Sequence, residues 1–303
     1  MNPPFVIVIS GPTAVGKTKL AISLAKKFNA SIISADSRQF YKEMRIGTAK
    51  PSQDELEQVP HHFINNISIT QSYSVGDFEK EVLVFLDDYF KSNKIIFIVG
   101  GSGLYIDAVT KGLDYFPEVD IEIRKQVNDD FESKGLEFLQ KELQDCDIEY
   151  YNEVDIQNPQ RIIRAIEIFR SSGKPFSSFR QKESKSRPFN VIKIAIIMDR
   201  AALYKKINLR VDEMMENGLL DEVRSLTGFS NLNALQTVGY QELFAYLADS
   251  VTLKEAVDLI KRNTRRYAKR QLTWFKRDPE NQWFDTNDPG IIESFIIQEM
   301  KKK

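Results

Sequence analysis

Cysteine is nearly absent from this sequence of 303 residues, in which Cys146 stands alone. One cysteine cannot form a disulfide within the chain, and the sequence has neither a CxxC pair nor the Cys/His spacing of a zinc site. We therefore expect a protein of a reducing compartment without a zinc centre.

Long hydrophobic runs are lacking as well. The first apolar run, Phe5–Ile9, is five residues long and follows no basic stretch. A membrane helix needs about 20 apolar residues, and a secretory signal begins with positive charge. These absences predict a soluble, cytoplasmic protein, for which a monomer is the default expectation.

Neither sign of charge is in excess, because 42 Lys and Arg oppose 43 Asp and Glu. Any surface that binds a polyanion must therefore come from local clustering of cations. Hydrophobic residues make up 42% of the chain and charged residues 28%, which is typical of a globular protein. At roughly 150 residues per domain, the length predicts about two domains.

What the sequence does contain is a series of short apolar runs that end in polar or glycine-rich turns. The runs are Phe5–Ile9, Ser31–Ser34, Ile95–Val99 and Val191–Ile197, and segments of helical periodicity follow the first three. This order predicts an α/β fold, with a parallel sheet of the P-loop type flanked by helices. Ligands bind such sheets at the carboxyl ends of the strands.

Over residues 117–188 the pattern changes to charged sequence with helical periodicity. We interpret this stretch as an inserted all-helical domain, within a core formed by residues 1–116 and 189–303. Its last part, residues 177–187, is polar and basic and predicts a mobile connection.

Three helices are predicted outside the first half of the core. Asn158-Pro159 is typical of a helix start, with Gly173 at the end of that helix. Residues 201–217 predict an amphipathic helix with Arg210 on its more polar side. Residues 253–277 predict a long helix that has no acidic residue after Asp258.

The strongest motif is Gly11-x-x-x-x-Gly16-Lys17-Thr18, placed between a predicted strand and a predicted helix. Its glycines let the backbone N–H groups and the helix N-terminus surround a phosphate. Lys17 adds positive charge, and the Thr18 hydroxyl can hold a magnesium ion. The motif, familiar from ATP-binding proteins, predicts a diphosphate or polyphosphate ligand without specifying ATP.

Asp36 follows the second apolar run and is the next candidate. It could bind magnesium or act as a general base, or it could simply cap the following turn. The third run ends in Gly100-Gly101, where many nucleotide hydrolases place an acidic magnesium ligand. This difference argues against a plain NTPase.

Two further features need an interpretation. His61 and His62 are adjacent and have no ligand partner at a suitable spacing, so we expect a structural role. The helix over residues 253–277 carries a cation cluster interleaved with Tyr267 and Trp274, which favours contact with nucleic acid phosphates. The cluster comprises Lys261, Arg262, Arg265, Arg266, Lys269, Arg270, Lys276 and Arg277, and Arg161 and Arg164 form a second basic pair.

Seven ordered blocks of this chain resemble the tRNA dimethylallyltransferases. They cover nearly the whole sequence and are far more specific together than the phosphate loop alone. The blocks are residues 11–18 (GPTAVGKT), 34–39 (SADSRQ), 46–51 (IGTAKP), 100–105 (GGSGLY), 158–161 (NPQR), 238–240 (VGY) and 264–274 (TRRYAKRQLTW).

The resemblance implies transfer of a dimethylallyl group from dimethylallyl diphosphate to N6 of adenosine 37, just 3′ of the anticodon, in tRNAs that read codons beginning with U. Magnesium is the implied cofactor, and no membrane is involved. Asp36 would accept the proton from the adenine amine, while Lys17, Thr18 and Arg210 would stabilise the departing diphosphate. The diphosphate-binding loop would be Gly11, Pro12, Thr13, Ala14, Val15, Gly16, Lys17 and Thr18.

The resemblance also implies a set of tRNA contacts, and it assigns part of them to the inserted domain. These residues are Asp36, Ser37, Arg38, Gln39, Ser102, Arg124, Gln160, Arg161, Ile162, Ile163, Arg164, Gln236, Thr237, Val238, Gly239, Tyr240, Gln241, Thr264, Arg265, Arg266, Lys269, Arg270 and Gln271. Two positions depart from the family pattern: Asn65-Asn66 stands where Asp is usual, and Ser102 replaces the commoner Thr.

Three other functions compete with this one. A phosphate-loop kinase of a small metabolite would turn over ATP. A non-catalytic RNA-binding protein would have no need of Lys17, Thr18 and Asp36. A prenyltransferase of free adenine nucleotides would share the donor, but the cation clusters favour a polymeric acceptor.

Overall fold

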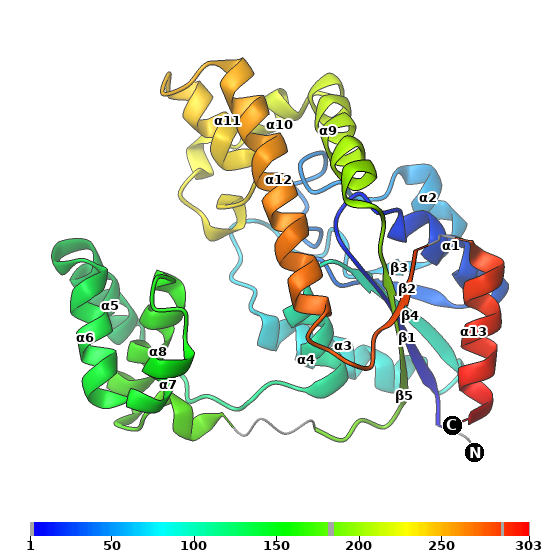
Figure 1. The fold of residues 1–303 in the computed structure, drawn as a ribbon, viewed down its shortest axis with the longest axis horizontal. Helices are drawn as coiled ribbons and strands as arrows, with labels where there is room; N and C mark the ends of the chain where they lie inside the picture. Colours follow the sequence, from blue (N-terminus) through cyan, green and yellow to red (C-terminus); the bar gives the residue numbers. More distant parts are fainter. Residues whose placement is uncertain (1–2, 181–184, 286–287, 303) are drawn as a thin grey trace. The chain divides into compact units, whose positions relative to one another are not determined.

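The structure, a computed structural model, describes residues 3–180, 185–285 and 288–302 (Figure 1). It divides into two compact units, Met1–Lys111 with Ser186–Lys303, and Gly112–Lys185. The second unit overlaps the insertion expected at residues 117–188 and begins and ends a few residues earlier. Part of the expected connection at 177–187 lies outside the described residues.

The first unit contains a six-stranded sheet in the order β3-β2-β4-β1-β5-β6, in which every pairing is parallel. Its strands are β1 (Phe5–Ser10), β2 (Ser31–Ser34), β3 (His61–His62), β4 (Ile95–Gly100), β5 (Asn190–Ile196) and β6 (Gln282–Phe284). Its α-helices are α1 (Lys17–Lys27), α2 (Gln53–Gln58), α3 (Val75–Tyr89), α4 (Gly103–Lys111), α9 (Arg200–Glu216), α10 (Leu219–Ser225), α11 (Tyr240–Leu247), α12 (Leu253–Phe275) and α13 (Pro289–Lys302). Two 3₁₀ turns, η2 (Thr227–Phe229) and η3 (Asn233–Leu235), precede α11.

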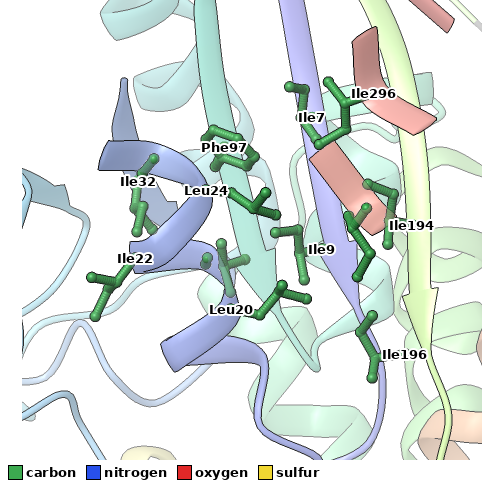
Figure 2. Packing of buried hydrophobic residues seen from close by; sticks show 14 of the residues in the cluster. Ile7, Ile9, Leu20, Ile22, Leu24, Ile32, Phe97, Ile194, Ile196 and Ile296 are labelled. Atoms are coloured by element: carbon green, nitrogen blue, oxygen red, sulfur yellow. The ribbon is translucent and has the colours of Figure 1, made fainter. Parts of the chain in front are cut away.

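The sheet buries both faces, because alternate side chains of each strand point to opposite sides. On one side, Ile7 and Ile9 of β1 pack with Leu20 and Leu24 of α1 and with Ile296 of α13 (Figure 2). On the other side, Val6 and Val8 pack against α3 and α4. A continuous apolar strand is the expected sequence for such a position, and β1 is buried along its whole length.

Four helices that follow β5 in the sequence form a separate helical layer of the first unit. Its helices α9, α10, α11 and α12 share an apolar core with residues 40–46, in which Phe40, Met44 and Tyr240 are fully buried. Figure 1 shows α12, in orange, running beside α9 and α11. This layer brings residues from near both ends of the chain next to one another.

In the second unit, all regular elements among the described residues are helices. It contains α5 (Ile121–Lys134), α6 (Leu136–Cys146), α7 (Ile148–Glu153), α8 (Pro159–Ser172) and the 3₁₀ turn η1 (Phe176–Phe179), which pack around Val127, Leu139 and Ile162. The predicted start of α8 is confirmed, since Asn158 Oδ1 accepts the Arg161 N–H at 3.3 Å and Pro159 is the first helical residue. Gly173 ends the helix in the left-handed conformation.

The predicted fold class is confirmed: a parallel sheet flanked by helices, with an inserted all-helical unit. Among the described residues, no helix is both long enough and apolar enough to cross a membrane.

Candidate active site at the carboxyl edge of the sheet

The phosphate loop connects β1 to α1, as predicted, and its backbone is tightly constrained. Gly16 adopts the left-handed conformation at the start of α1. A Cβ on Gly11 would lie 2.6 Å from the Ile196 carbonyl oxygen, so only glycine fits beside β5. Ala14 also has a positive φ of 64°, which L residues rarely adopt. The loop therefore stores local strain at the place where the sequence predicts a ligand.

Lys17 points back into this loop. Its ammonium donates hydrogen bonds to the carbonyl oxygens of Gly11 at 2.9 Å and Pro12 at 2.7 Å. Burial, assisted by the nearby charge of Arg210, lowers the pKa of Lys17 to about 7, and Asp36 opposes that shift. A buried amine with so low a pKa gains much from an anion, because an anion compensates the charge that burial disfavours.

Asp36 lies two residues beyond β2, at the same edge of the sheet. Burial raises the pKa of its carboxyl group, against the opposing effects of the Arg38 N–H and the Lys17 charge. One carboxylate oxygen accepts the Arg38 N–H at 3.0 Å, so Asp36 also caps its own turn. The Ser102 hydroxyl accepts the Ser37 N–H at 3.0 Å and fixes this turn to the start of α4. The capping role and a chemical role are therefore compatible.

Arg210 reaches the loop from α9. Its Nη1 donates to the Thr13 hydroxyl at 3.0 Å, and burial lowers its pKa. The prediction placed Arg210 on the more polar side of its helix. In the structure, this side of the helix faces the phosphate loop and not open solvent. Arg210 and Lys17 are half-buried, and their charges act on each other and on Asp36.

These groups line one cavity of about 910 Å³. Its other walls carry apolar side chains, including Ile46, Ile64, Leu209 and Met214. The sequence-predicted residues that it brings together are Thr13, Ala14, Gly16, Lys17, Thr18, Asp36, Gln39, Arg210 and Gln271. An anion-binding pole, a carboxylate and apolar walls in one cavity suit a substrate that joins a diphosphate to a small hydrocarbon.

The cavity wall that includes Arg45 and Ile46 is held by contacts that have no signature in the sequence. The Glu222 carboxylate on α10 accepts three successive N–H groups, from Arg45, Ile46 and Gly47. The Tyr240 hydroxyl donates to the same carboxylate at 2.6 Å. Because the partners are backbone groups far away in the sequence, no local motif marks Glu222.

Lys50 is a further cation of this wall. Its ammonium donates to the carbonyl oxygen of Tyr41 and, at 2.6 Å, to the amide oxygen of Asn65. Burial lowers the pKa of Lys50 to about 8, although Glu222 and Glu43 oppose this shift. The unusual Asn65 thus has a defined place as a neutral partner of a cavity lysine.

Helix α12 presents two different faces. Arg262, Arg266, Lys269 and Arg270 are exposed, as the prediction of a cationic surface requires. Tyr267 faces the cavity, where burial and the charge of Asp36 raise its pKa to about 12.

Two other cations of α12 turn toward α9. Arg265 donates to the Asn208 side chain at 2.7 Å, and Lys261 pairs with Asp212. They are half-buried, so the cationic surface is smaller than the sequence predicts.

Four residues expected to contact tRNA have buried side chains in the described structure. Ser102 is bonded to the Ser37 N–H, Ile162 belongs to the core of the second unit, Tyr240 is bonded to Glu222, and Gln271 is bonded to the phosphate loop. None of these side chains is available to RNA in this conformation. The resemblance carried over positions in the sequence but not the directions of side chains.

Within the second unit, the buried Glu167 carboxylate pairs with Arg124 at 3.3 Å and Arg164 at 3.2 Å. Arg124 nevertheless remains exposed, as do Gln160 and Arg161, and Arg164 is half-buried. In the first unit, Gln236 and Gln241 are exposed and bonded to each other, between η3 and α11.

The histidines agree with a structural role. His61 Nδ1 lies 2.8 Å from the Val59 carbonyl oxygen, and the His62 ring packs 4.3 Å from the Phe85 ring. The described residues contain no group of three or more His, Cys, Asp or Glu side chains that could hold a metal ion. The Thr18 hydroxyl does line the cavity, as a magnesium site shared with phosphate oxygens would require.

A family model described as IPP transferase matches residues 39–278. The chain belongs to the IPP transferase family. The chain is 52% identical over 291 residues to the tRNA dimethylallyltransferase of Christiangramia forsetii, covering 95% of this chain and 96% of that one. It is 49% identical over 304 residues to the tRNA dimethylallyltransferase of Flavobacterium johnsoniae, with 98% of each covered.

Solved structures of IPP transferases agree with this assignment. The full-length tRNA isopentenylpyrophosphate transferase of Bacillus halodurans has a TM-score of 0.73 at 37% identity, covering 99% of this chain and 97% of that one. A eukaryotic dimethylallyltransferase acting on tRNA has a TM-score of 0.77 at 28% identity, covering 94% of this chain and 74% of that one. The predicted family and enzyme class, tRNA dimethylallyltransferase, are confirmed.

Proposed function

We propose that this enzyme transfers the dimethylallyl group of dimethylallyl diphosphate to N6 of adenosine 37 in tRNAs that read codons beginning with U. The observation that carries the proposal is the cavity itself, which Asp36 lines together with Lys17 and Arg210. The relatives named tRNA dimethylallyltransferase support the reaction class.

The proposed step is a displacement at the first carbon of the dimethylallyl group. The N6 nitrogen forms the new C–N bond, the C–O bond to the diphosphate breaks, and its electron pair leaves with the diphosphate. Asp36 accepts the proton from N6. The raised pKa of Asp36 suits this role, since it makes the carboxylate a stronger base than an exposed aspartate.

Lys17, Arg210 and the N–H groups at the start of α1 bind the diphosphate and stabilise the charge that develops on it. Thr18, with oxygens of the diphosphate, would hold magnesium, which supplies further positive charge to the leaving group when bound. The apolar wall with Ile46, Leu209 and Met214 surrounds the hydrocarbon part and excludes water.

The acceptor is proposed to be the anticodon stem-loop, whose adenine must leave its stack to reach Asp36. Exposed cations of α12 would contact its phosphates, as would Arg124, Arg161 and Arg164 of the second unit. We further propose that the enzyme works as a cytoplasmic monomer.

Incubation with radiolabelled dimethylallyl diphosphate and magnesium tests the function, with unmodified tRNA and AMP offered as separate acceptors. Label in tRNA alone, located at adenosine 37 by nuclease mapping, is the expected result. Label in AMP would identify a nucleotide prenyltransferase. If neither acceptor is labelled, the proposed reaction is wrong.

A further inference from the structure

Gln271 differs from its neighbours on α12. Its side chain is 6% exposed, whereas Lys269 and Arg270 are exposed. Burying an amide is unfavourable unless its donor and acceptor groups both find partners. Gln271 meets this condition, since Oε1 accepts the Thr13 N–H at 2.9 Å and Nε2 donates to the Gly101 carbonyl oxygen at 3.0 Å. One amide therefore joins α12 to the phosphate loop and to the residue after β4.

Gly101 provides the space for this amide. A Cβ at position 101 would lie 2.1 Å from Gln271 Nε2, a separation that real atoms do not tolerate. The same Cβ would otherwise have room, because the next neighbour outside Gln271 is the Gly11 carbonyl oxygen at 3.6 Å. The glycine that stands in place of an acidic residue after β4 is thus explained by the side chain that fills its surroundings.

The contact acts on the most constrained part of the phosphate loop. Thr13 is held through its N–H by Gln271 and through its hydroxyl by Arg210 at 3.0 Å. The next residue, Ala14, has the disfavoured φ of 64°. Such a conformation persists only where its surroundings determine it. Both hydrogen bonds are made to Thr13, the residue directly before Ala14.

We propose that Gln271 is a positioning residue of the diphosphate-binding loop and not an RNA contact. The inference rests on the proposed function, because it takes the phosphate loop as the binding site of the donor. Gln271 lies at the cavity lining, but both polar groups of its amide are already bonded to backbone atoms of the protein. It holds Thr13 and Ala14 in the geometry that lets the following N–H groups and Lys17 surround the diphosphate.

The test compares Gln271→Met with the wild-type enzyme, because methionine keeps the length of the side chain and removes both hydrogen bonds. We expect KM for dimethylallyl diphosphate to rise about tenfold, equivalent to about 1.4 kcal/mol, and kcat to change less than twofold. The dissociation constant of inorganic diphosphate, measured by calorimetry, should rise by the same factor. Binding of an anticodon stem-loop should change less than twofold.

Thr273→Val is the matched control. Thr273 lies on the exposed face of α12, where its hydroxyl bonds to the Lys269 carbonyl oxygen, so the variant also exchanges a polar side chain for an apolar one. It should leave KM and the diphosphate dissociation constant at wild-type values. If Gln271→Met instead weakens stem-loop binding and leaves diphosphate binding unchanged, Gln271 is an RNA contact and the inference is wrong.

A second set of variants keeps the test decisive if Gln271→Met folds poorly. Gly101→Ala places a methyl group against the amide, so it should raise KM for the donor about as much as loss of the amide does. In a Gln271→Ala background the same change should add less than twofold, because the clash is gone. Independent, multiplicative effects would contradict the proposed contact.

The same measurements separate the inference from the function on which it rests. A wild-type enzyme that fails to bind inorganic diphosphate would overturn the donor site itself. If the wild-type enzyme and Gln271→Met bind inorganic diphosphate with equal affinity, only the proposed role of Gln271 is wrong.

Discussion

The cations of this enzyme fall into two groups that differ in their surroundings. Lys17 and Arg210 are half-buried around the phosphate loop, and this partial burial lowers the pKa of each. Arg262, Arg266, Lys269 and Arg270 are exposed on α12. The first group is partly removed from water and suits one compact anion. The second remains hydrated and suits an extended polyanion whose binding releases counterions.

This difference separates the two substrates by physical principle. A buried cation should act on the chemical step and on donor affinity, with weak dependence on salt. An exposed one should act on acceptor affinity and lose its effect as salt rises. The following variants test that division, beginning with the carboxylate that lies beside the buried group.

The largest effect is expected for Asp36→Asn. The amide oxygen can still accept the Arg38 N–H, so the turn is kept while the base is lost. We expect kcat to fall about 10³-fold, within the usual range for a general base, with stem-loop affinity changed less than twofold. Rapid-quench assays and filter binding measure the two quantities, with Asp87→Asn on the exposed side of α3 as control. Full activity of Asp36→Asn would exclude it as the base.

Lys17→Met should follow, with kcat/KM for the donor lowered about 10²-fold at every salt concentration. Because the folded protein then no longer buries an ammonium, its thermal midpoint should stay the same or rise. Donor kinetics and a melting curve test this pair of outcomes. A large fall in the melting temperature would mean that Lys17 is needed for folding and not for anion binding.

The exposed pair Arg266→Ala with Lys269→Ala should weaken stem-loop binding about tenfold at low salt and lower the slope of log K against log salt by about 2. Donor KM should not change. Lys254→Ala, at the exposed start of the same helix, is the matched control. Equal salt slopes for the double variant and the wild type would place the RNA elsewhere.

The pH dependence sharpens the comparison further. Lys17 has its pKa lowered to about 7 in the free enzyme, so its charge is present below pH 7 and lost above it. We expect kcat/KM for the donor to fall about fivefold between pH 7 and pH 8, as follows from a single ionisation. Lys17→Arg should reduce this fall to less than twofold, because arginine keeps its charge. An unchanged profile would assign the ionisation to another group.

A buried cation with a carboxylate partner should behave differently again. Lys193 on β5 is bonded to Asp278 at 2.8 Å, and so is Lys111. Burial disfavours ionisation of Asp278, but these two hydrogen bonds outweigh it and lower the pKa to about 2. Stability from this group is therefore present above pH 4 and lost as pH falls toward 2.

Asp278→Asn tests this third case. We expect it to lower the free energy of unfolding at pH 7 by about 2 kcal/mol, with donor KM unchanged. Urea unfolding at pH 7 and pH 3 measures the effect, which should be about half as large at the lower pH. An effect on donor affinity that exceeds the effect on stability would contradict the division between structural and binding cations.

The sequence could predict what local signals determine. Phe5–Ile9 is apolar at every position, the glycines of the phosphate loop stand at fixed offsets, and Asn158 precedes a proline. Each of these patterns specifies a backbone conformation within a few residues. The position of Asp36 at the edge of the sheet followed from the order of strands alone.

Contacts between distant segments were not predictable in this way. Glu222 binds the N–H groups of residues 45–47, and Gln271 binds Thr13, so the partners are backbone groups without a sequence signature. Tyr240 and Ile162 stand in matching segments, yet their side chains point into the core. The direction of a side chain depends on the packing around it, and no single motif specifies that packing.

The strand order determines how long β1 remains unpaired while the chain is being synthesised. β1 leaves the ribosome first, yet it pairs with β4, which begins at residue 95, and with β5, which begins at residue 190. At about 5–20 residues per second, its five apolar residues wait on the order of 5–20 s for the first partner strand and roughly twice as long for the second. The strand that bears the phosphate loop is therefore an exposed aggregation-prone segment during synthesis, and we expect it to be a preferred binding site for chaperones that act on nascent chains.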